Sequence, residues 1–268
     1  MRGPTSAEIT ATRSWLAKKG VQVETPTPLL AVRIGGQFTS RMRVAFFLLP
    51  LLSGPAMFGL LFLRSALDGV WRELADGLPT AVLSVVMFGG VWIATRLVDR
   101  DIVRRLPREA VRPRRSLSLL GPWYLAAAAI TFGGGVALLV AILLTTSARG
   151  YALSELGLIT LYAVWFACFL AIALNTRVVA EDAGSRAVDD ALWVRSLYLG
   201  APAIYAWLML ISLPFLDGPP PEFAAPTYIY IALAIGTQVI GGVVHWKRYR
   251  KLPPGEYGVP AVTGSGLP

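Results

Sequence analysis

The chain has 268 residues, of which 55% are hydrophobic and 15% are charged, and its mean hydropathy is +0.58. This balance excludes a soluble single domain, because six charge-free stretches, each reaching the ~20 residues that a helix needs to cross hydrocarbon, make up about half of the chain. The sequence therefore predicts an all-α membrane protein with six transmembrane helices. The predicted spans are 44–63, 77–95, 116–148, 156–176, 196–216 and 223–246.

The net charge of +9 is placed asymmetrically about these spans. Of the 25 Lys and Arg residues, 22 precede the first span, follow the second or fourth span, or follow the sixth. This positive-inside pattern predicts a multi-pass protein of the bacterial cell membrane with both termini in the cytoplasm. The excess is explained by orientation and by attraction to anionic inner-leaflet lipids, at about 1 kcal/mol per residue. No nucleic-acid partner is expected, because no basic run accompanies a reading module.

Three regions are predicted along the chain. Residues 1–40 form a cytoplasmic segment in which Thr5 and Glu8 make a T-x-x-E capping box ahead of a short helix. Its apolar residues and nearby lysines predict an interfacial amphipathic helix on the inner leaflet, and a disordered tail with a transient helix is the alternative. Residues 41–251 form the transmembrane domain, and residues 252–268 form a flexible C-terminal tail.

Internal similarity predicts three tandem two-helix hairpin repeats. An arginine and a proline seven residues later open each odd-numbered span: Arg43 and Pro50, Arg115 and Pro122, Arg195 and Pro202. The pattern T-R-x-V-x-x-D-x-x-x-R occurs at 95–105 and again at 176–186. Parallel repeats of this kind are related by an axis along the membrane normal. They could enclose a central path or simply tile a bundle.

Few residues inside the predicted spans carry chemistry. No Asp, Glu, Lys or Arg lies well inside a span, which disfavours ion-coupled transport. His245 is the single histidine and Cys168 the single cysteine, so both are expected to serve packing, and no metal or cofactor is predicted. Thr237 and Gln238 are the candidate substrate contacts, although Gln238 could instead hydrogen-bond to a neighbouring helix.

The cytoplasmic connections carry the other candidate site. The repeated pattern places Asp101 four residues before Arg105 and Asp182 four residues before Arg186, which predicts surface elbow helices. Such elbows could dock a partner, or they could only contact anionic lipid. The predicted docking residues are Arg96, Arg100, Arg104, Arg105, Arg177 and Arg186.

An enzyme is not expected. The acidic pairs 181–182 and 189–190 could hold a divalent cation for a lipid-phosphate transferase, but a solvated loop explains them equally. The chain has no glycine-rich phosphate loop, and no catalytic residue is assigned.

Two functions from different classes fit this layout. The first is the membrane-spanning subunit of an export or transport system for a hydrophobic or amphiphilic substrate, served by a separate ATPase or other cytoplasmic subunit. The alternative is a non-catalytic membrane scaffold or sensor that recruits soluble partners through its basic loops.

Overall fold

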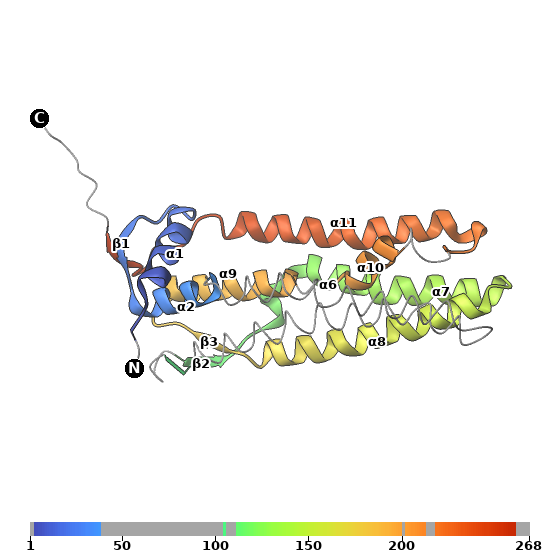
Figure 1. Cartoon of the computed structure of the whole chain (residues 1–268), viewed down its shortest axis with the longest axis horizontal. Coiled ribbons are helices and arrows are strands. Elements are labelled where there is room, and N and C mark those ends of the chain that lie inside the picture. Colours follow the sequence, from blue (N-terminus) through green and yellow to red (C-terminus); the bar gives the residue numbers. More distant parts are fainter. Residues whose placement is uncertain (1–2, 39–103, 106–110, 200–201, 213–217, 261–268) are drawn as a thin grey trace, which may run out of the picture.

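The structure is a computed structural model that describes residues 3–38, 104–105, 111–199, 202–212 and 218–260. It is mostly helical and has two parts: a bundle of long apolar helices and a polar layer gathered at one end of that bundle (Figure 1). The predicted first and second spans lie outside the described residues.

Three rods in the bundle are long and apolar enough to cross a membrane: Leu117–Thr145, Arg149–Leu174 and Pro221–Arg248. They overlap the third, fourth and sixth predicted spans. The elements that form them are η3 (Leu117–Leu120), α6 (Gly121–Ala129), η4 (Ile130–Gly134), α7 (Gly135–Thr145), α8 (Arg149–Leu174), η5 (Pro221–Phe223) and α11 (Ala224–Arg248).

Apolar side chains lie on both the inner and the outer faces of these helices. Ile142 and Ile159 are almost fully buried in the shared core, whereas Leu144, Val164 and Ile229 are well exposed on the outside. Outward-facing apolar surface of this extent is typical of helices in contact with lipid. The structure thus supports the prediction of a helical membrane protein.

The fifth predicted span is divided between two helices. Helix α9 (Ala183–Leu199) begins inside the predicted cytoplasmic connection, and α10 (Ile204–Ser212) follows it. Pro202 and Ala203 form a turn between them. The division has a local cause, because proline has no N–H for the helical ladder and its ring clashes with the preceding turn.

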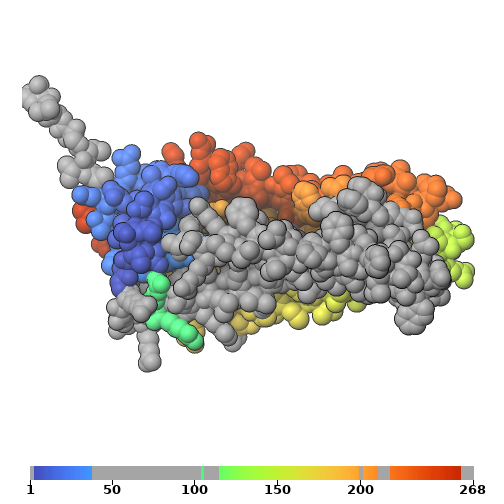
Figure 2. Space-filling view, viewed as in Figure 1, coloured from blue at the N-terminus to red at the C-terminus, as the bar shows by residue number. Residues whose placement is uncertain are grey.

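The polar layer joins segments from both ends of the chain. Strand β1 pairs antiparallel with β4, and β2 pairs antiparallel with β3. Figure 2 shows the N-terminal segment in blue at the same end as the last described residues of the C-terminal segment in red. The layer consists of α1 (Ser6–Ala17), β1 (Val23–Pro26), α2 (Pro28–Phe38), β2 (Val111–Arg114), β3 (Arg177–Val179), β4 (Gly258–Pro260) and the start of α9.

The C-terminal segment contributes to the polar layer as far as Pro260. Strand β4 is paired with β1, and the Tyr257 side chain is buried in the layer's core. The flexibility predicted for residues 252–268 stays a prediction. Gly258 is required at the start of this strand, since its φ is +133° and an added Cβ would lie 2.0 Å from the carbonyl oxygen of Thr25. Residues 261–268 lie outside the described part of the chain.

The N-terminal capping box is confirmed. The Glu8 amide donates to Thr5 Oγ1 at 3.3 Å, and the Thr5 amide donates to Glu8 Oε2 at 2.8 Å. The apolar face behind it, including Leu16 of α1 and Leu30 of α2, is buried in a core shared with α9 and Tyr257. These side chains face protein; contact of the segment with the inner leaflet stays a prediction.

The predicted elbow helix at 176–186 is wrong in its first half. Residues Arg177–Val179 form strand β3, which pairs with β2 of the other basic connection. The β-branched side chains of Val178 and Val179 are buried, which favours a strand at this position. Residues 95–103 of the first elbow lie outside the described residues, and the threefold repeat stays a prediction.

Candidate functional sites

Glu155 lies inside an apolar helix and is the main site residue that the sequence prediction missed. The predicted fourth span begins at 156, directly after this charge, but α8 begins at Arg149 and carries Glu155 in its second turn. The helix therefore begins before the predicted span and includes an acid near its start. Tyr205 of α10 donates a hydrogen bond from its hydroxyl to Glu155 Oε2 at 2.6 Å, a distance typical of a charge-assisted bond.

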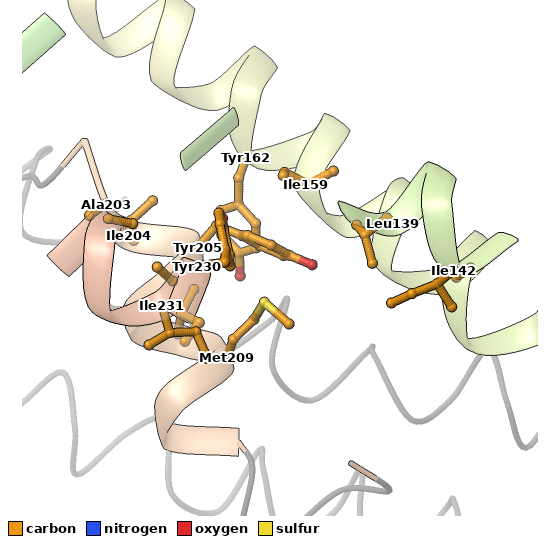
Figure 3. Packing of buried hydrophobic residues seen from close by; sticks show 14 residues of the cluster. Leu139, Ile142, Ile159, Tyr162, Ala203, Ile204, Tyr205, Met209, Tyr230 and Ile231 are labelled. Atoms are coloured by element: carbon orange, nitrogen blue, oxygen red, sulfur yellow. The ribbon is translucent and has the colours of Figure 1, made fainter. Parts of the chain in front are cut away.

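Tyrosines from three helices surround this region. Tyr162 of α8, Tyr205 of α10 and Tyr230 of α11 converge in the bundle core (Figure 3), and all are less than a tenth exposed. The Tyr162 and Tyr205 rings lie 6.1 Å apart. Tyr151, Tyr205 and Tyr230 all interact electrostatically with Glu155. Among the described residues, the group that stabilises the carboxylate is thus the Tyr205 phenol and not a cation.

A π-helical segment adjoins these tyrosines. The rod formed by α6 and α7 passes through η4, and Tyr230 donates to the carbonyl oxygen of Thr131 within η4 at 2.8 Å. Gly135 permits this approach, because an added Cβ would lie 2.5 Å from Ile159 Cδ1 and 2.8 Å from the Tyr230 hydroxyl oxygen. Short π segments inside α-helices are frequent at functional sites.

Gln238 bridges the two halves of the divided fifth span. Its Oε1 accepts a hydrogen bond from the Ala203 amide at 3.2 Å, and its Nε2 donates to the Tyr198 carbonyl at 3.3 Å. The side chain thereby satisfies backbone groups that would otherwise be left unpaired beside a helix break. At a rise of 1.5 Å per residue, Gln238 lies about 15 Å along α11 from Arg248, well inside the rod.

Thr237 is placed differently from its neighbour. Its hydroxyl donates to the Leu233 carbonyl of its own helix at 2.7 Å, and it faces outward from the described bundle. The structure therefore shows an interhelical role for Gln238 and a local bond for Thr237. Substrate contact by either residue stays a prediction.

An open groove of about 620 Å³ lies at the end of the bundle opposite the polar layer. Phe223 forms part of its wall and also packs against the core that contains Tyr205. The groove is lined by Thr145, Thr146, Ser147, Ala148, Pro220, Pro221, Glu222 and Phe223.

A second buried charge site lies in the polar layer. Asp189 of α9 is fully buried and binds both Arg33 of α2, at 2.6 Å from Nε, and Arg115, through its Nη2. Arg115 also reaches Asp190 at 3.1 Å, and the Val179 amide donates to Asp189 at 3.2 Å. One carboxylate thus connects α2, β3, α9 and the residue that precedes the third span.

The electrostatics of this cluster are set by burial and by opposite charge. Burial lowers the pKa of Arg115, and the nearby Asp189 carboxylate opposes that shift. Burial raises the pKa of Asp190, and Arg115 opposes it. The Arg115 guanidinium also lies 5.0 Å from the Trp193 ring centroid, a cation–π contact. The pair 189–190 therefore faces internal arginines instead of forming an open cation site.

Asp182 has a capping role at the start of α9. Its carboxylate accepts from the Ser185 amide at 2.7 Å, the Gly184 amide at 3.2 Å and the Glu256 amide at 2.9 Å. Burial alone would raise the pKa of Asp182, but these hydrogen bonds outweigh it and lower the pKa. The predicted partner Arg186 is exposed.

The predicted docking residues differ in how exposed they are. Arg104, Arg177 and Arg186 are exposed, whereas Arg105 is partly buried and its Nη1 lies 2.9 Å from Glu8 Oε1. Arg96 and Arg100 lie outside the described residues. Docking of a partner or of anionic lipid at these residues stays a prediction.

The single histidine and cysteine also differ from each other. The His245 ring packs between Tyr198, at 5.8 Å, and Tyr249, at 4.7 Å between centroids, as a packing role predicts. Cys168 is exposed on α8 instead of packed in the core, and its small apolar side chain faces outward with other hydrophobic residues.

No protein-family model matches the chain, and comparisons with curated proteins and with solved structures give no match either. The geometry of the sites described above therefore carries the functional inference.

Proposed function

We propose that this protein is the membrane-spanning subunit of an export or transport system for a hydrophobic or amphiphilic substrate. The observation that carries the proposal is the break between helices α9 and α10. Beside this break, the Gln238 side chain hydrogen-bonds to the backbone of Tyr198 and Ala203. Broken helices deep in the membrane commonly build substrate sites in transporters, because their backbone groups are free to bind a ligand.

The hydrogen bonds that Gln238 makes at this break could be exchanged for bonds to a substrate. The amide of Gln238 has two N–H donors and an oxygen with two lone pairs, so it retains bonding capacity after contacting Tyr198 and Ala203. A substrate with a polar group can replace one of these bonds while its apolar part lies against the surrounding side chains. The apolar residues that follow the break in α10, including Ile204 and Leu208, fit a hydrophobic or amphiphilic cargo.

Energy for transport would come from another chain. A separate ATPase or other cytoplasmic subunit would dock on the polar layer, where Arg104, Arg177 and Arg186 are exposed. Anionic inner-leaflet lipids would contact the same basic surface.

The experiment is to delete the gene and measure efflux of a panel of amphiphilic dyes, with the restored wild-type gene and Gln238→Leu compared. We expect deletion to slow efflux, the wild-type gene to restore it, and Gln238→Leu to restore less than a tenth of it. Thr237→Val is the matched control, because it changes the adjacent residue without touching the break, and it should restore efflux fully.

Protein level and thermal stability of each variant are measured in detergent, so that loss of fold is separated from loss of transport. Unchanged efflux after deletion, together with no ATPase co-purifying with the protein, would overturn the proposal.

A second candidate is the scaffold or sensor, and the exposed arginines of the polar layer favour it. In that case replacing Arg104, Arg177 and Arg186 by Gln should abolish recruitment of a soluble partner. Gln238→Leu should then affect stability alone.

A further inference from the structure

We propose that Glu155 and the surrounding tyrosines bind the charged group of a lipophilic organic cation, such as a protonated amine or a quaternary ammonium or phosphonium ion. The inference rests on the proposed transport function and names its substrate class. The observation behind it is a carboxylate held by Tyr205 inside an apolar helix bundle.

The charge balance at Glu155 favours a cationic ligand. A carboxylate inside a membrane bundle is costly unless opposite charge or hydrogen bonds stabilise it. The described groups that interact with it are the phenols of Tyr151, Tyr205 and Tyr230; Tyr205 donates a hydrogen bond to it, and none of the three carries a positive charge. A bound organic cation would supply the charge that the described residues do not.

The walls of the site suit the apolar part of such a cation. Tyr162, Tyr205 and Tyr230 present aromatic rings from three different helices (Figure 3). Aromatic faces attract cations, and most strongly where water is excluded. A carboxylate beside several tyrosines therefore selects a large, weakly hydrated cation over a small inorganic ion.

The groove at the bundle end, which Glu155 does not itself line, is the entrance in this proposal. Its volume of about 620 Å³ is within the range of small-molecule sites. Glu222 adds an acidic group and Phe223 an aromatic one to its lining, while the neighbouring Arg149 is exposed to solvent. Glu155 lies seven residues along α8 from Ala148, or about 10 Å deeper at the helical rise. A cation would thus meet Glu222 first and Glu155 further in.

Protonation of Glu155 should compete with the ligand. The groups that face it are Tyr151 on α8, Tyr205 on α10 and Tyr230 on α11, and phenols titrate near pH 10 in water. Between pH 8 and pH 5 the carboxylate of Glu155 is therefore the group among these whose charge can change. Binding should weaken toward low pH.

The test measures binding of tetraphenylphosphonium to the purified full-length protein in nanodiscs by equilibrium dialysis. Tetraphenylborate, an anion of nearly the same shape, is the ligand control. We expect the wild type to bind the phosphonium at least tenfold more tightly than the borate. Phosphonium binding should weaken at least threefold from pH 8 to pH 5.

Glu155→Gln is the informative variant, because Gln keeps an oxygen acceptor for Tyr205 while removing the charge. It should weaken phosphonium binding at least tenfold and abolish the pH dependence. Glu181→Gln, an exposed acid in the polar layer, is the matched control and should bind as the wild type does. Equal binding by the wild type and Glu155→Gln, or borate binding as tight as phosphonium binding, would overturn the inference.

The pH profile and the cation-to-anion ratio of the wild type need no variant, so they decide the question even if Glu155→Gln does not fold. Failure of this inference is distinct from failure of the transport proposal. Efflux of neutral amphiphiles that depends on the gene, with no preference for the phosphonium over the borate, would leave transport standing and remove only the cation site.

Discussion

Asp189 and Glu155 are both acids within the protein, yet their surroundings are opposite. Asp189 is enclosed by Arg33 and Arg115, so its charge is compensated on two sides. Glu155 receives a hydrogen bond from Tyr205, and the described residues that interact with it are phenols rather than arginines. The first arrangement ties four parts of the polar layer together, whereas the second is a carboxylate that no cation of the described residues pairs with. Compensated charge is suited to holding a structure, and uncompensated charge to binding a ligand.

The largest expected effect comes from breaking the compensated site. Asp189→Asn would leave Arg33 and Arg115 buried without their shared countercharge, and removing one partner of a buried ion pair costs ≈ 3–5 kcal/mol. We expect a large fall in thermal stability in detergent and poor yield. Glu181→Asn, an exposed acid of the same connection, is the control and should have little effect. A stability equal to wild type for Asp189→Asn would contradict the structural role of the cluster.

The next largest loss of stability is expected from adding a side chain at Gly135, which packs against Ile159 and Tyr230. Gly135→Ala would place a Cβ 2.5 Å from Ile159 Cδ1 and 2.8 Å from the Tyr230 hydroxyl. Overpacking of this kind costs ≈ 1–3 kcal/mol, measured as a lower thermal midpoint. Gly236→Ala is the matched control on α11, since an added Cβ there meets open space and alanine favours a helix. A larger loss for Gly236→Ala than for Gly135→Ala would contradict the packing seen here.

A smaller effect on stability is expected from changing Glu155, and this effect can be compared directly with that of Asp189→Asn. Glu155→Gln keeps an acceptor for Tyr205, so stability should change by less than about 1 kcal/mol. Glu155→Leu removes the acceptor and leaves the Tyr205 hydroxyl unpaired, which should cost about 1–3 kcal/mol. Chemical denaturation of both variants checks the order. A loss for Glu155→Gln as large as that for Asp189→Asn would make the two sites equivalent.

The sequence predicts those features that depend on neighbouring residues. Long apolar stretches determine where α8 and α11 lie, and the Thr5–Glu8 capping box is a bond between residues three positions apart. Both follow from local composition and spacing, so no knowledge of tertiary packing is needed.

The polar contacts escape prediction because they join distant parts of the chain. Arg33 and Asp189 are 156 positions apart, and no local pattern indicates their pairing. Glu155 is not predicted for another reason. A charged residue marks the end of a predicted span, whereas helix α8 continues through this acid, to which Tyr205 donates a hydrogen bond. Strand β3 replaced the predicted elbow because its partner β2 comes from another connection.

The smallest expected effect concerns Asp182, which is compensated by backbone amides instead of arginines. Its pKa is lowered in the folded protein, so its stabilising contribution is present above its ordinary pKa of 3.8 and is lost as the pH falls through the lower folded value. Asp182→Ala removes the cap of α9 and the bond to Glu256, at about 1 kcal/mol for a helix cap.

A spin label at Pro254→Cys, with Cys168→Ala, reports how firmly the C-terminal segment is held. With Asp182 present, label mobility should be low at pH 7 and rise only at a pH below 3.8, because the pKa of the folded carboxylate is lowered from that value. With Asp182→Ala the label should already be mobile at pH 7 and respond little to acid. The same acid response in both proteins would show that β4 alone holds the segment, and that amide donors at Asp182 contribute less than the arginines do at Asp189.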